Sequence, residues 1–127
     1  MIAHLITIGF VAVGGAIGAV ARYGVNVSAS HLFGHGFPWG TLIVNVVGSF
    51  LMGVAIVKFA QIEISAPLKT MMITGFLGAF TTFSTFSLDI FHFISAGRYW
   101  FAISYLLLSI ILGLTAVTLG IILARLS

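Results

Sequence analysis

Long runs of apolar residues constrain the fold of this chain more than any other feature. Of its 127 residues, 61% are hydrophobic and only 6% are charged, with five Lys or Arg and two acidic residues, Glu63 and Asp89. A soluble domain carries about 25% charged residues, and a helix needs about 20 apolar residues to cross a bilayer. The sequence therefore predicts an integral membrane protein with short connections and no soluble domain.

Charges and helix-breaking residues divide the chain into four spans. Pro38 fits the first turn of the second helix and Pro67 opens the third, because the first turn leaves its N–H groups unpaired. Gly97 and Arg98 form the turn before the fourth. The N-terminal run lacks the positive flank of a signal peptide, so we expect it to remain as a span. The prediction is an all-α fold, one four-helix transmembrane domain over residues 1–127, with spans at about residues 2–30, 38–59, 66–95 and 99–125.

Loop charge gives little information on orientation. With four crossings, the termini and the second connection share one side, which carries Lys58, Lys69 and Arg125, while Arg22 and Arg98 lie on the other. Such a small difference is a weak signal by the positive-inside rule. We infer insertion in both orientations and an antiparallel homodimer; fixed insertion by other cues is the alternative. Basic residues scattered singly also give no nucleic-acid footprint.

Small residues recur at helical spacing in the first and fourth spans. Gly14 and Gly18 form a small-xxx-small pair, as do Gly15 and Ala19. Such stripes let helix backbones approach closely in lipid. They fit packing within one subunit and packing between subunits equally well. The stripe of the fourth span consists of Ser109, Gly113, Ala116, Gly120 and Ala124.

The run TTFSTFS at residues 81–87 places five hydroxyl groups and two phenylalanines inside the third span. Hydroxyl side chains offer the backbone alternative hydrogen bonds and loosen a helix. Irregular backbone at membrane depth is tolerated only where it packs in protein or lines a water-filled path. The run therefore predicts a broken third helix built around a binding or permeation site.

Several residues near this break are candidates for binding an ion. Asn45, in the middle of the second span, either joins helices through its amide or faces a polar path. Phe83 and Phe86 share one helix face, and the electropositive rim of a phenyl ring attracts an anion without trapping it. An unwound stretch also frees carbonyls, and those of Gly78 and Thr81 suit a hard cation such as Na⁺.

The few other ionisable residues support no enzyme. Arg22 either snorkels to the interface or draws anions into a vestibule. His31 and His35 are spaced for a metal, but their glycine-rich segment is not expected to be helical, and tight sites want more ligands. No catalytic triad, paired carboxylates or phosphate loop is present, and cysteine is absent.

The chain resembles the Fluc (CrcB-type) fluoride channels of bacteria over nearly its whole length. The motifs that carry the resemblance are GAIGAVARY at residues 15–23, GTLIVNVVG at residues 40–48 and, most specifically, GFLGAFTTFSTFS at residues 75–87. The resemblance implies an antiparallel dual-topology homodimer in the bacterial inner membrane, with two narrow pores that export fluoride passively. It also implies that such a channel lowers cytoplasmic fluoride and gives fluoride resistance.

The resemblance assigns roles by motif position. Phe83 and Phe86 resemble pore phenylalanines, Asn45 a pore donor to fluoride, and Arg22 a vestibule arginine. The carbonyls of Gly78 and Thr81 resemble ligands of a structural Na⁺ on the dimer axis. A polar track is expected to continue along Ser84, Thr85, Tyr105 and Ser109.

Two departures and two rival functions accompany this interpretation. Gly113 stands where another hydroxyl is expected one turn after Ser109, and Asp89 stands where relatives are expected to carry Glu.

A proton-coupled exporter needs a titratable carboxylate within a span, and the first span has none. A purely structural subunit would explain the small-residue stripes but not the polar break beside Asn45.

Overall fold

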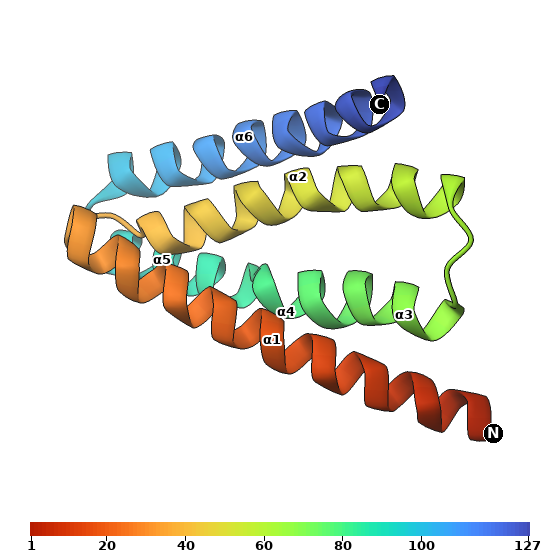
Figure 1. Ribbon diagram of the computed structural model, residues 1–127. Helices are drawn as coiled ribbons and strands as arrows, with labels where there is room; N and C mark the ends of the chain where they lie inside the picture. Colours follow the sequence, from red (N-terminus) through yellow and green to blue (C-terminus); the bar gives the residue numbers. More distant parts are fainter.

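Four helical spans make up the computed structural model, which describes all residues 1–127 (Figure 1). The first is α1 (Ile2–Phe33), the second is α2 (Trp39–Gln61), and the fourth is α6 (Tyr99–Leu126). The third span, Ala66–Ser95, is divided into several segments. All four are long and apolar enough to cross a membrane, which confirms the all-helical membrane fold expected from composition.

Both chain termini lie at the same end of the molecule as the connection between α2 and the third span (Figure 1). The opposite end holds the connection between α1 and α2 and the turn into α6. This is the arrangement that four alternating crossings require.

The first helix is longer than the sequence indicated. It continues through His31 to Phe33 and ends where Gly34 adopts a φ of +76°, which glycine tolerates because it has no Cβ. The expectation that the segment around His31 is not helical was therefore wrong for His31, while His35 does lie in the bend beyond the helix. The error arose because the glycine itself, and not the preceding histidine, ends the helix.

Pro38 also lies one position earlier in its helix than predicted. It is the N-cap of α2, with a ψ of 63° that is not helical, and the helix begins at Trp39. Its carbonyl accepts the N–H of Leu42 at 3.1 Å, the first bond of the helix. Pro67, by contrast, lies in the first turn of α3 (Ala66–Thr70), and Gly97 forms the turn before α6 with a φ of +72°.

The third span changes its helical type twice. It begins as α3, widens into the π-helix η1 (Met71–Leu77), continues as α4 (Gly78–Phe80), breaks, and resumes as α5 (Phe83–Ser95). The break is the feature predicted from the hydroxyl-rich run. No local sequence signal predicted the π-helical turns. Such turns are rare in proteins, and those that do occur are often found at functional sites.

Glycines in the packed helices are held against neighbouring backbone. A methyl group at Gly14 or Gly18 of α1 would overlap the carbonyl oxygen of Met71 or Phe76. A methyl at Gly120 of α6 would overlap the carbonyl of Phe50 in α2. The question left open by the small-residue stripes is therefore answered for these glycines: they pack within one chain.

The interior of the single chain is small, since only 22 of 127 residues are buried and most large apolar side chains face outward. This distribution suits a protein whose surroundings are lipid. One buried cluster lies between α2, α5 and α6 and is centred on Tyr105, whose exposed fraction is 0%. The cluster comprises Leu42, Phe86, Phe93, Ala102 and Tyr105.

Candidate functional site

The third span breaks at Thr81 and Thr82, where the backbone becomes extended. Thr81 has φ and ψ of −83° and 160°, and Thr82 has −153° and 124°. The side chain of Thr82 then caps α5, because its Oγ1 accepts the N–H of Thr85 at 3.2 Å. A threonine at the N-cap is a preferred start for a helix, so the hydroxyl run both ends α4 and begins α5.

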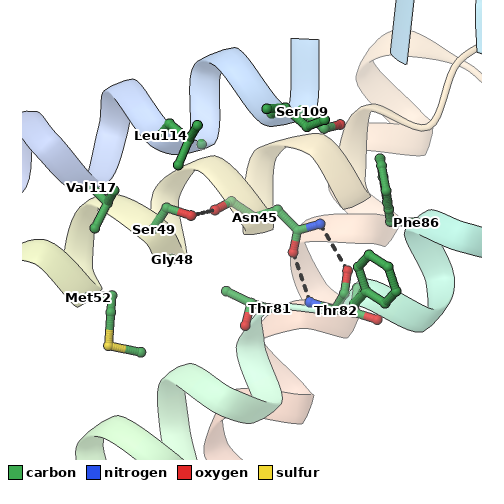
Figure 2. Close-up of a pocket in the computed structure, with 13 residues that line it drawn as sticks. Asn45, Gly48, Ser49, Met52, Thr81, Thr82, Phe86, Ser109, Leu114 and Val117 are labelled. Atoms are coloured by element: carbon green, nitrogen blue, oxygen red, sulfur yellow. Dashed lines mark hydrogen bonds between the residues drawn. The ribbon is translucent and has the colours of Figure 1, made fainter. Parts of the chain in front are cut away.

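Asn45 of α2 holds the break in place. Its Nδ2 donates to the carbonyl of Thr82 at 3.0 Å, and its Oδ1 accepts the N–H of the same residue at 2.8 Å (Figure 2). The amide thus satisfies both polar groups of a residue that has left the helix. The close approach of α2 to the break depends on Gly48, one turn after Asn45, where a methyl group would overlap Cγ2 of Thr81.

Of the two roles weighed for Asn45, the structure shows the joining role within one chain. The second N–H of its Nδ2 makes no hydrogen bond, and Asn45 also lines the pocket described below. It therefore keeps one donor for a ligand.

The break removes the usual donors from the backbone carbonyls that precede it, those of Gly78 and Thr81 among them. In a continuous helix, the N–H of Thr82 would bond the carbonyl of Gly78, and the N–H of Thr85 would bond that of Thr81. Here those N–H groups bond Asn45 Oδ1 and Thr82 Oγ1 instead. Gly78 is also exposed on the single chain. Carbonyl oxygens without donors are the ligand type that a hard cation prefers, so both residues fit the predicted Na⁺ site.

A pocket of about 530 Å³ lies between α2, the break and α6, and it opens to the surface of the chain (Figure 2). Ser109 lines it, and the Ser109 hydroxyl is buried without a hydrogen-bond partner. Buried polar atoms are nearly always paired, so the Ser109 hydroxyl is a candidate hydrogen-bonding group beside the pocket. The other lining residues are Asn45, Gly48, Ser49, Met52, Thr81, Thr82, Phe83, Phe86, Ile110, Gly113, Leu114 and Val117.

The two predicted pore phenylalanines differ sharply in environment. Their ring centroids are 5.8 Å apart, and both residues line the pocket. Phe86 is buried against Tyr105, with centroids 5.1 Å apart, whereas Phe83 is 79% exposed. One ring is therefore fixed by the chain itself, and the other projects from it.

The remaining hydroxyls of the break form a small network. The Thr82 hydroxyl lies 3.2 Å from that of Thr85 and 3.4 Å from that of Ser84, and both of these residues are exposed. Thr85 also lines a second cavity, of about 250 Å³, together with Asn26, Thr41 and Asp89.

Tyr105 is not brought into the main pocket. Its hydroxyl donates to Asp89 Oδ2 at 3.0 Å, and its ring fills the core. Of the predicted track on α6, Ser109 reaches the pocket and Tyr105 does not.

Arg22 is half-buried on α1 and lines none of the three main cavities. Its vestibule role stays a prediction.

Sequence reasoning missed Ser49. Its Oγ lies 3.8 Å from the position that a Cβ on Gly113 would occupy, and it donates to the Asn45 carbonyl at 2.6 Å. The hydroxyl that we expected at position 113 of α6 is absent, and the Ser49 hydroxyl of the facing helix α2 lies next to that position. The signal was available, because residues four apart share a helix face, and Ser49 follows Asn45 by four.

Comparison of the sequence with known proteins places this chain in a family. Residues 9–121 match the model described as "CrcB-like protein, Camphor Resistance (CrcB)". The chain belongs to the CrcB family. It is 46% identical to a protein of Hahella chejuensis over 97% of this chain and 95% of that one, and 49% identical to a protein of Shewanella amazonensis over 87% and 90%. Both relatives are named "Fluoride-specific ion channel FluC".

These findings confirm the predicted resemblance. A third relative, from Agrobacterium fabrum, carries the same channel name at 44% identity over 95% of this chain and 98% of its own. Together with four spanning helices, they identify a multi-pass bacterial membrane protein of a channel family, and not an enzyme.

Proposed function

We propose that this chain is a fluoride-selective channel that lets fluoride leave the bacterial cytoplasm passively and so gives fluoride resistance. The observation that carries this proposal is the broken third helix, pinned by Asn45 beside an open pocket, in a chain that aligns over nearly its full length with relatives named as fluoride channels. Fluoride is small and strongly hydrated, so a pore for it must replace water with hydrogen-bond donors.

The donors beside the pocket suit this task. Asn45 keeps one N–H, Ser109 has an unpartnered hydroxyl, and Phe83 presents an exposed ring. None carries a full charge, and the edge of an aromatic ring is only weakly positive. Conduction needs binding that admits the ion and also releases it, which such weak donors provide.

The functional unit of the proposal is an antiparallel homodimer with two pores. In a lone chain, the extended backbone at Thr81 and Thr82 would lie beside a pocket open to acyl chains, which membrane proteins avoid. A second copy over this face would cover the exposed side chain of Phe83 and the hydroxyls of Ser84 and Thr85.

A Na⁺ ion between the copies would be held by the carbonyls of Gly78 and Thr81, which have lost their helical donors. It would supply a fixed positive charge beside the anion path. The chain's own contribution is to present those carbonyls by keeping Thr82 out of the helix.

The test is ion efflux from liposomes that contain the purified protein. We expect fluoride efflux at channel rates and no measurable chloride efflux under the same gradient. Absence of fluoride efflux from protein of native size, or exchange in fixed ratio with protons, would refute the proposal.

A further inference from the structure

A third pocket, of about 310 Å³, lies away from the helix break. It is formed where α5 ends and α6 begins, against the connection between α1 and α2. Unlike the pocket beside the break, it gathers ionisable side chains. Its lining consists of His35, Gly36, Pro38, Asp89, His92, Phe93, Ala96 and Arg98.

The residues that follow Arg98 place this pocket at the depth of the lipid headgroups. Arg98 is the N-cap of α6, so it stands at the end of a span. Tyr99 is 60% exposed and Trp100 is 80% exposed. Exposed Tyr and Trp at the end of a transmembrane helix sit at the membrane–water interface, and the pocket therefore faces the layer of headgroups.

The guanidinium of Arg98 is positioned but has no hydrogen-bonding partner. It lies over the rings of Phe93 and Phe101, at 5.3 and 4.0 Å from their centroids. It makes no ion pair in the structure, so its N–H groups are available. A guanidinium stacked on rings keeps its planar fork in one orientation, and that fork matches a phosphate group.

The charges in the pocket favour a headgroup that is neutral overall. Asp89 lines the same pocket as Arg98, and the two opposite charges cancel. A phosphatidylglycerol headgroup would offer the same phosphate to Arg98 but only neutral hydroxyls to the Asp89 carboxylate. A phosphoethanolamine headgroup carries a phosphate and a primary ammonium, so each of its charges has a partner here.

We infer that this pocket binds the headgroup of a phosphoethanolamine lipid, with its phosphate on Arg98 and His92 and its ammonium toward Asp89. The inference concerns a lipid site and does not depend on which ion the channel conducts.

The test is a lipid titration of the purified protein in detergent, followed by native mass spectrometry. Arg98→Lys keeps the charge and the loop balance but loses the fork, and Arg125→Lys is its matched control, since Arg125 is exposed in the last turn of the same helix. We expect Arg98→Lys to weaken binding of phosphatidylethanolamine on the order of tenfold, the size of one charge-assisted hydrogen bond. Arg125→Lys should bind as the unaltered protein does.

Asp89→Asn supplies an independent check, because it should remove the preference for phosphatidylethanolamine over phosphatidylglycerol while both lipids still bind. The same spectra report whether each variant keeps its native assembly. The inference is overturned if phosphatidylglycerol binds the unaltered protein as tightly as phosphatidylethanolamine, or if the two arginine variants behave alike. Displacement of the lipid by millimolar inorganic phosphate would also overturn it, since the site would then be one for a soluble anion.

Discussion

At the scale of single residues, Asn45 and Thr82 show how one side chain stabilises an interruption in a membrane helix. They are 37 residues apart in the chain, and both polar atoms of the amide bond the backbone of one residue. Each unpaired backbone group in a bilayer costs several kcal/mol, so the amide is needed for the break to persist.

Replacing Asn45 with alanine should therefore destabilise the fold. Asn45→Ala leaves the N–H and carbonyl of Thr82 unpaired, at a cost of about 1–3 kcal/mol for each buried group. Thr118→Ala is the control, because the Thr118 hydroxyl bonds only the Leu114 carbonyl of its own helix. Thermal unfolding in detergent should show a lower Tm for Asn45→Ala alone. Equal Tm values for the two variants would show that the hydrogen bonds between Asn45 and Thr82 do not stabilise the fold.

The two phenylalanines should separate conduction from stability. Phe83 lines the pocket of the proposed pore, so Phe83→Ile should slow fluoride efflux at least tenfold, corresponding to about 1.4 kcal/mol. Because Phe83 is 79% exposed within its own chain, this variant should lower the Tm less than Phe86→Ile does. Phe86→Ile should lower both, since Phe86 packs on Tyr105 and reshaping a packed core costs about 1–3 kcal/mol. Phe91→Ile, at an exposed position of the same helix, should alter neither. Undiminished efflux through Phe83→Ile would remove that ring from the path.

At the scale of the elements, α1 is held against the third span by glycines that touch backbone. The pattern of small residues predicted close contact, but it did not say with which helix. The contact falls on η1, whose π-helical turns were not predicted. The hydroxyl-rich run predicted where the third span breaks, whereas no local pattern in the sequence predicted the π-helical turns of η1.

A methyl group at this contact should weaken the packing of α1. Gly18→Ala would overlap the Phe76 carbonyl, and overpacking of this kind costs about 1–3 kcal/mol. Gly24→Ala, in the same helix with nothing within 4 Å, is the matched control and should be neutral or slightly stabilising. Unfolding midpoints in denaturant would measure both. A neutral Gly18→Ala would mean that α1 can move away from η1 without loss.

At the scale of the whole molecule, the single chain leaves a polar break, an exposed Phe83 and an unpaired Ser109 hydroxyl around one open pocket. The extended backbone and its exposed hydroxyls are unfavourable in lipid, and the second copy that we propose would cover them together with Phe83. The weak loop-charge bias of the sequence fits a partner inserted in the opposite orientation.

Shifting the loop charges should therefore abolish function and a complementary shift should restore it. Gln61→Lys adds a charge beside the second connection, and His31→Lys adds one at the other end of the bundle. We expect cells that express either variant alone to lose most fluoride resistance, and cells that express both to regain it. Full resistance from each variant alone would argue against an antiparallel pair.

The four spans, the turn at Gly97 and the break near Thr81 could be predicted from the residues alone, because each follows from local composition and backbone preference. Tertiary structure decided which backbone Asn45 bonds, which of two neighbouring phenylalanines is buried, and that Tyr105 turns to Asp89 and away from the pocket. The physical reason is that these outcomes depend on which helix faces which. That choice is made by contacts between residues far apart in the chain, and local pattern does not encode it.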